Sequence, residues 1–403
     1  MDPCPLPEPL AYHRQVRDYL RLHEPEVWAW FSSPKSQEEY AGSIRLELLK
    51  SSYRLDLATY GELHAAAVEV KARLELDVPL TLYQAQSGGE MNARIYYLPG
   101  EAHVVLQGQL HGLLTARELT ALLGHELAHY RLWTCSDGDY LTAFRVLHAM
   151  ALDPRAENSH LLTARRFEQY VEIYADRGAL AATSDLHLVI ASLVKVQTGL
   201  KEVSAAAYLA QAEEIFAKHD VQSAPLTHPE SFIRARALAL WKAAPDQADA
   251  AIAGMIEGKL ALRTLDLMGQ VATERAARSV IEGLLERPWF RTESVVALSK
   301  LYFGDLEPGA APEVPLSEIA RAAAAADDAY REWLAYVLLD FALADRELGE
   351  PAQALALVTA AEIGVSAPLE ERMKKELKLT KKELEVLKKA APELARAAGA
   401  VSA

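Results

Sequence analysis

The segment from Thr115 to Trp133 constrains the fold of this chain more than any other. Thr115 followed by Glu118 has the spacing of a capping box, which fixes the start of a helix. The residues that follow, LTALLGHELAHYRL, repeat apolar side chains at helical period, so the helix continues to about Trp133. His125 and His129 stand four residues apart in it and share one face. Both imidazoles can therefore reach one point in space.

The pentapeptide His125-Glu126-Leu-Ala-His129 is the H-E-x-x-H pattern of a zinc site. Two imidazoles on one helix face suit a single tetrahedral ion. Glu126 lies on the neighbouring flank, where its carboxylate can act as general base toward a water molecule. With 12 His in 403 residues, the pattern arises by chance roughly 0.03 times per chain. The alternative is an exposed helix whose histidines only pair with carboxylates.

A catalytic zinc ion needs a third protein ligand and an open fourth position. Cys4 and Cys135, the two cysteines, have no suitable neighbours, which leaves His, Asp or Glu further along the chain. The segment EQYVEIYADRG places Glu168, Glu172 and Asp176 on one helix face. By spacing alone Glu168 and Glu172 compete equally as the third ligand. Asp176, one turn after Glu172, can accept a hydrogen bond from a zinc-bound His.

Three ordered motifs, GHELAHY, EIYADRGAL and THPESFIRARAL, resemble the gluzincin-type zinc metallopeptidase family that includes HtpX and the CaaX prenyl proteases. The resemblance covers roughly residues 60 to 245. It implies Glu172 as the third ligand and Asp176 as its companion, and Glu168 falls outside the pattern. It also implies that His228 and Arg234 lie near the reacting carbonyl, where either would donate to the oxyanion.

The upstream sequence MNARIYYLPGEAHVVLQ resembles the Asn-Ala strand of the same family. The resemblance implies an edge strand that pairs with an extended substrate. The substrate-binding residues implied are Asn92, Ala93, Arg94, Ile95 and Tyr96.

Charge and hydropathy limit the partners and the compartment. The chain carries 56 acidic and 42 basic side chains, a formal net charge of -14, which excludes a nucleic-acid partner. Members of the resembling family are commonly embedded in membranes, whereas no run of eighteen apolar residues occurs in this sequence. The N-terminal residues also lack the pattern of a signal peptide. We therefore expect a soluble cytoplasmic protein.

The periodicity predicts an α+β fold that is mostly α, a zincin-like core with a small three-stranded sheet. Residues 8–77 are predicted as a helical scaffold. The segments PLTLYQAQ, ARIYYLP and AHVVLQ, separated by turn signals, are predicted as the strands. Further helices are predicted at 139–150, 158–184 and 186–200.

The predicted domain order places the metallopeptidase domain and its scaffold at 1–245, a helical extension at 246–303, a Gly- and Pro-rich linker at 304–317 and a helical module at 318–403. The last module weakly resembles the small TerB-like domains, in which an Asp-rich turn carries a metal. Asp340, Asp345 and Glu347 are the matching positions. Ordinary solvated acids between two helices remain the favoured reading of these three residues.

The sequence predicts one zinc ion per chain and hydrolysis of protein or peptide substrates, as an endopeptidase. The alternative is a zinc-scaffold protein with weak or no catalysis that binds a protein partner through its C-terminal helices. The intact general base Glu126 favours the enzyme.

Overall fold

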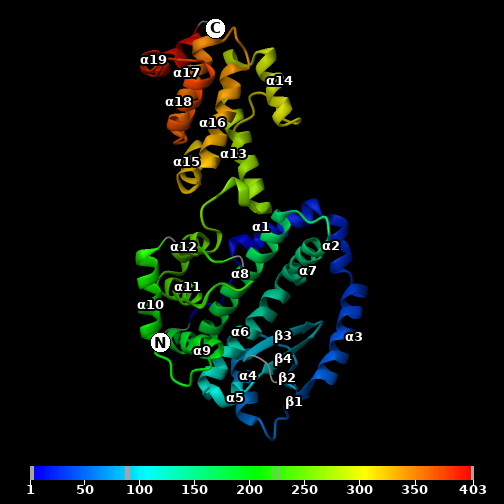
Figure 1. The fold of residues 1–403 in the computed structure, drawn as a ribbon. Helices are drawn as coiled ribbons and strands as arrows, with labels where there is room; N and C mark the ends of the chain where they lie inside the picture. Colours follow the sequence, from blue (N-terminus) through cyan, green and yellow to red (C-terminus); the bar gives the residue numbers. More distant parts are fainter. Residues whose placement is uncertain (1–3, 87–90, 220, 225–226, 401–403) are drawn as a thin grey trace. The chain divides into compact units, whose positions relative to one another are not determined.

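The computed structural model describes residues 4–86, 91–219, 221–224 and 227–400. The chain divides into two compact units, of which the first ends at Gly258 and the second begins at Lys259. Helices dominate both units, and the first also holds a sheet, which confirms the predicted α+β, mostly α class (Figure 1).

The first unit has the following elements: α1 (Ala11–His23), α2 (Pro25–Ser32), α3 (Pro34–Ser51), β1 (Ser52–Arg54), α4 (Gly61–Arg73), β2 (Leu80–Ala85), β3 (Asn92–Leu98), β4 (Glu101–Gln107), α5 (Leu110–Leu113), α6 (Ala116–Thr134), η1 (Cys135–Gly138), α7 (Asp139–Leu152), α8 (Asn158–Thr183), α9 (Leu186–Thr198), α10 (Ala205–Lys218), α11 (Ser231–Ala243) and α12 (Pro245–Glu257).

Four strands of the described residues form one mixed sheet in the order β1-β2-β4-β3. The three predicted strands are present, and the prediction missed β1, which pairs antiparallel with β2. β1 has three residues, too few to show an alternating pattern. β3 and β4 are joined by Pro99 and Gly100, whose φ of 74° suits the glycine position of a type II turn. This order makes β3 an edge strand.

The two faces of the sheet meet different helices. Tyr96 and Leu98 of β3 pack with Ile44 and Leu48 of α3. Tyr97 points to the opposite face by strand alternation and packs against Tyr130 of α6, with ring centroids 5.3 Å apart. α6 therefore lies beneath the edge strand, and α8 crosses α6 on its other side (Figure 1).

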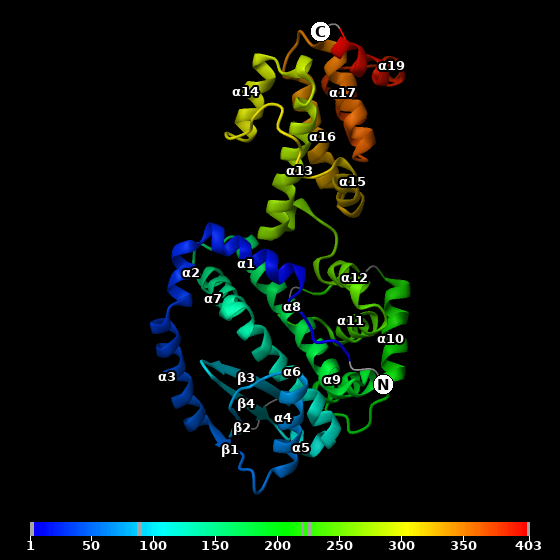
Figure 2. The same ribbon diagram turned by 180° about the vertical axis from the view of Figure 1, so that it is seen from behind.

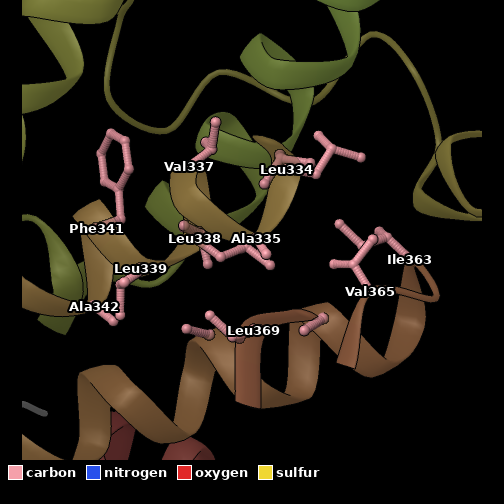
Figure 3. Close-up of a cluster of buried hydrophobic side chains, with 14 of the residues drawn as sticks. Leu334, Ala335, Val337, Leu338, Leu339, Phe341, Ala342, Ile363, Val365 and Leu369 are labelled. Carbon is pink, nitrogen blue, oxygen red and sulfur yellow. The ribbon is translucent and has the colours of Figure 1, made fainter. Parts of the chain in front are cut away.

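The second unit is helical. Its elements are η2 (Leu262–Thr264), α13 (Leu267–Leu285), η3 (Pro288–Phe290), α14 (Glu293–Tyr302), α15 (Leu316–Ala325), α16 (Asp328–Leu343), α17 (Gly349–Glu362), α18 (Ser366–Glu376) and α19 (Lys381–Ala400). α13 packs against α15 and α16 (Figure 2). Side chains such as Leu338, Phe341 and Leu369 fill an apolar core between α16 and α18 (Figure 3).

The compact units differ in position from the predicted domain boundaries. α12 packs on α8 and α11 and therefore belongs to the first unit. Residues 304–317, predicted as a linker, lie inside the second unit, where Leu306 is fully buried. The Val314 N–H there donates to the hydroxyl of Ser279 on α13 at 3.0 Å.

Candidate metal centre

α6 positions both histidines. The predicted capping box is present, since the Thr115 N–H donates to Glu118 Oε2 at 2.9 Å and the Glu118 N–H donates to Thr115 Oγ1 at 3.3 Å. The helix thus starts in a fixed register, and His125 and His129 fall on the side that faces α8. Their Nε2 atoms lie 3.2 Å apart.

Glu172 of α8 joins the two histidines. Its Oε2 lies 3.5 Å from Nε2 of His125, and its Oε1 lies 3.7 Å from Nε2 of His129. One ligand atom from each of these three residues lies within 4.8 Å of the other two, so the three side chains can hold one metal ion. α6 and α8 approach closely because each has a glycine at the crossing. A Cβ on Gly178 of α8 would lie 2.1 Å from the Cβ of Ala128, and a Cβ on Gly124 of α6 would lie 2.9 Å from the Cβ of Ala182.

Glu168, the equal candidate by spacing, has a different partner. Its Oε1 lies 2.7 Å from Nε2 of His148 on α7. Glu168 lines the same cleft as Glu172 but lies outside the group of three. The structure therefore brings Glu172 to the histidines, the arrangement that the family resemblance implies.

Asp176 and Arg234 contact the side chains of this group of three. Asp176 Oδ1 lies 3.0 Å from Nδ1 of His125. Arg234, near the start of α11, donates to Asp176 from Nε at 2.8 Å and from Nη2 at 2.6 Å, and its Nη1 lies 3.2 Å from Glu172 Oε2. The side chains of Asp176, Arg234 and Glu172 are buried, and that of His125 is 15% exposed. The Nδ1–H of neutral His125 can therefore donate to Asp176, which leaves the lone pair of Nε2 directed at Glu172.

The charges of this cluster set its protonation. Burial raises the pKa of Asp176, but the charge of Arg234 outweighs it and holds that pKa well below its usual value. At Glu172 burial again raises the pKa, but the charges of Arg234 and the histidines outweigh burial and lower the pKa below its usual value. Burial lowers the pKa of His129 to about 3, so this ring is neutral at pH 7. Neutral imidazole and ionised carboxylate are the forms that bind metal.

Glu126 is ionisable near neutral pH. Its side chain is 5% exposed, and burial raises its pKa to about 7, although the charges of His125 and Arg234 act in the opposite direction. A carboxyl group with a pKa close to the working pH is well matched to accepting and returning a proton.

A divalent cation fits the cluster by distance and by charge. Ligands about 2.0 to 2.1 Å from a tetrahedral zinc ion lie about 3.4 Å from one another. Here the two Nε2 atoms are 3.2 Å apart, and each lies 3.5 or 3.7 Å from one carboxylate oxygen of Glu172. Glu126, Glu172 and Asp176 contribute three negative charges when ionised, and Arg234 contributes one positive charge. A cation of charge two would bring this buried group to neutrality, which favours its binding.

The remaining predicted residues border the same cleft. His228 Nε2 lies 3.5 Å from Glu172 Oε1, and its side chain is 64% exposed. β3 lines the cleft along its free edge. Strand alternation places the side chains of Ala93 and Ile95 on the α6 face of the sheet and those of Arg94 and Tyr96 on the α3 face. The predicted edge-strand residues all line the cleft, namely Asn92, Ala93, Arg94, Ile95 and Tyr96.

The cleft has a volume of about 910 Å³ and follows α6 from Ala121 to Trp133. At a rise of 1.5 Å per residue this length is about 18 Å. The two histidines lie at its middle, so the cleft continues beyond the candidate metal site at both ends. Its length accommodates about five residues of an extended peptide at roughly 3.3 Å per residue.

Sequence reasoning missed two features of this site. The bonds of Arg234 to both carboxylates join α11 to α8, a contact between distant segments that no local pattern reveals. The close crossing at Gly178 did carry a signal, because a glycine inside a helical pattern often marks close packing.

Comparisons with known proteins agree with this geometry. Residues 58–242 match the profile of Peptidase family M48, and the match includes both metal-site motifs and Arg234. The chain is 28% identical over 217 residues to "Plastoglobule-localized metallopeptidase 48, chloroplastic" of Arabidopsis thaliana, covering 49% of this chain and 61% of that protein. The chain thus matches less than two thirds of that relative's length. No solved structure matches this chain. The expected resemblance of this region to a metallopeptidase family is confirmed.

None of the described helices combines the length and the apolar composition that crossing a bilayer requires. The name of the Arabidopsis relative locates that protein at chloroplast plastoglobules. The compartment of the present chain stays a prediction.

Proposed function

We propose that this protein is a zinc-dependent endopeptidase. The observation that carries the proposal is the convergence of His125, His129 and Glu172 from two crossing helices at the middle of a cleft, with Glu126 buried beside them. In this assignment His125, His129 and Glu172 hold the ion. Zinc bound there would supply a Lewis acid that polarises the peptide carbonyl and makes water easier to deprotonate.

Glu126 moves the proton. A carboxylate oxygen of Glu126 accepts a proton from the attacking water and then gives it to the nitrogen of the leaving amine. The buried surroundings that raise its pKa make it a stronger proton acceptor than an exposed glutamate.

Asp176 and Arg234 orient the ligands. Asp176 fixes the tautomer of His125 through Nδ1, and Arg234 holds both carboxylates in place. Since the guanidinium is already engaged with these two carboxylates, we assign Arg234 to positioning and His228 to the oxyanion. The side chain of His228 is exposed at the cleft, with Nε2 3.5 Å from Glu172 Oε1, and Nε2 can donate a hydrogen bond to the developing negative charge on the substrate.

The shape of the cleft supports cleavage within a chain rather than at its end. The free edge of β3 offers unpaired N–H and C=O groups to an extended peptide. Because the cleft continues past the metal site in both directions, substrate residues on both sides of the scissile bond can contact its walls.

The second candidate function is a binding protein that keeps the zinc site as a scaffold. The two proposals differ at Glu126, since a scaffold needs the three ligands but no proton acceptor. The decisive experiment compares zinc content and peptide hydrolysis in the same preparations of wild type, Glu126→Gln, Glu172→Gln and Glu168→Gln.

We expect wild type to bind one zinc ion and to hydrolyse a casein or peptide library, with activity lost to a chelator and restored by zinc. Glu126→Gln should keep its zinc and lose about 10² to 10⁴ in rate. Glu172→Gln should lose zinc affinity, whereas the matched control Glu168→Gln should keep it. Wild-type turnover by Glu126→Gln would contradict the enzyme proposal, and zinc loss in Glu168→Gln would contradict the ligand assignment.

A further inference from the structure

The two ends of the cleft have different walls. We call the end beside α9 the α9 arm; it is lined by the aliphatic residues Leu122, Val189, Leu193 and Val196. We call the end beside α7 the α7 arm; it is lined by Trp133, Leu141, Phe144 and Val171, with Arg145 and Glu168 nearby. The candidate metal site lies between the two arms along α6.

The α7 arm is built from aromatic rings. Trp133 at the end of α6 and Phe144 of α7 have ring centroids 5.1 Å apart, and Phe144 also contacts the ring of His148 at 4.0 Å. Leu141 and Val171, both buried, complete the lining of this arm. Rings at such spacing leave faces and edges on which a further ring can pack in an offset or edge-to-face arrangement.

The polar groups of this arm do not select a charged side chain. The carboxylate of Glu168 is 2.7 Å from His148, so it already has a cationic partner when that ring is protonated. Arg145 lies next to Phe144 on α7 and makes an interaction of its own. The surface left to a ligand is therefore mainly apolar and aromatic.

The α7 arm lies only a few substrate residues away from the scissile bond. Trp133 is four residues beyond His129 on α6, about 6 Å along the helix axis. An extended peptide on the edge of β3 advances about 3.3 Å per residue. A substrate side chain in the α7 arm therefore belongs to a residue about two positions from the scissile bond.

We propose that the α7 arm is a specificity subsite that takes an aromatic side chain of the peptide substrate, Phe, Tyr or Trp. The four described residues that define the α9 arm include no aromatic ring, so the aromatic preference lies on one side of the scissile bond. This inference rests on the proposed endopeptidase function, because it assigns a wall of the same cleft.

The first experiment maps cleavage sites by mass spectrometry after zinc-loaded full-length protein digests a randomised peptide library. We expect aromatic residues to be enriched on one side of the cut. Phe144→Ala should lower kcat/KM for the aromatic substrates by about 10- to 100-fold, while substrates with a small residue at that position change little. Phe144→Trp should retain the preference.

The matched control is Leu193→Ala in the α9 arm. It should alter the preference on the opposite side of the cut and leave the aromatic preference intact. If the library shows no aromatic preference, or if Leu193→Ala and Phe144→Ala change the same position, the subsite assignment is overturned.

A binding measurement separates this inference from the proposed function. Fluorescence anisotropy of a labelled peptide is followed with zinc-loaded Glu126→Gln protein, which holds substrate without turnover. Phe144→Ala in this background should weaken binding of an aromatic peptide at least 10-fold and spare its alanine analogue. Selective weakening with no wild-type cleavage would support the subsite and refute the enzyme; cleavage without any such weakening would refute the subsite alone.

Discussion

α8 in the first unit and α16 in the second are both central helices, yet they bury different chemistry. The buried side chains of α16 are apolar or aromatic throughout, as at Leu338 and Phe341 (Figure 3). α8 buries every residue from Gln169 to Ala182, including the charged side chains of Glu172, Asp176 and Arg177. α16 contributes mainly to the hydrophobic core, whereas α8 also buries charged side chains.

The buried side chains of α16 serve mainly stability, whereas the buried charges of α8 serve the candidate metal site. Burial of apolar side chains stabilises a fold, whereas a buried charge destabilises it unless a partner is held in good geometry. Each buried charge of α8 has such a partner: Arg234 for both carboxylates, and Asp249 for Arg177 at 2.6 Å. The packing around α8 should therefore be disrupted when one partner is removed, whereas α16 buries no charge that needs such a partner.

The largest expected effect comes from Arg234→Met. The change leaves Asp176 and Glu172 buried without their cation, and breaking a buried pair typically destabilises by about 3–5 kcal/mol. Loss of a group that orients metal ligands lowers metal affinity about 10- to 100-fold. Calorimetric unfolding of the first unit and zinc titration against a chromophoric chelator measure the two effects.

Arg275→Met is the control for this variant in the second unit. Arg275 pairs with Glu313, and both side chains are at least half exposed. Its loss should change stability by less than about 1 kcal/mol. Arg234→Lys should recover part of the zinc affinity because it keeps the charge. Equal effects of Arg234→Met and Arg275→Met would remove the distinction between the two units.

A smaller effect is expected from adding one methyl group at the helix crossing. In Gly178→Ala the new Cβ would lie 2.1 Å from that of Ala128, so α8 must move away from α6. Overpacking of this kind typically destabilises by about 1–3 kcal/mol. It also separates Glu172 from the two histidines, so zinc affinity should fall with stability.

Gly283→Ala in α13 is its counterpart. The new Cβ would meet only Pro312 Cγ, at 3.8 Å, which is an ordinary contact. Replacing a helical glycine by alanine without a clash should stabilise the second unit by about 0.5–1 kcal/mol. If Gly178→Ala left both zinc affinity and the first transition unchanged, the close crossing would have no part in forming the site.

The sequence predicts those parts of this site that depend on local spacing. His125 and His129 share a face because they are one turn apart, and Glu172 and Asp176 follow the same rule on α8. Spacing alone could not separate Glu172 from Glu168, because the choice depends on how α8 packs against α6 and α7. The motif order of the resembling family supplied that choice.

For the fold too, the sequence predicts the elements that follow a local pattern and not those that depend on contacts between distant segments. The strands β2, β3 and β4 and the helices α6 to α9 follow periodic segments, and their predicted positions agree with the structure to within two or three residues. β1 was missed because its three residues form a strand only through pairing with β2. The extent of the second unit depends on packing of residues such as Leu306, which a linker-like composition does not reveal.

The smallest effect predicted for the first unit concerns pH and His13. All twelve histidines precede the second unit. His13 is fully buried against Phe167, and burial lowers its pKa to about 3. The unfolded chain takes up a proton near pH 6.5 and the folded chain does not, so stability falls as the pH drops below about 6.5. From about pH 7.5 to about pH 5.5 the free energy of unfolding falls by about 1.4 kcal/mol because of this single group.

Calorimetry across this range should show that His13→Gln removes that part of the pH dependence in the first unit, while the transition of the second unit shows no histidine contribution. A slope that His13→Gln leaves unchanged would mean that His13 is protonated in the folded protein.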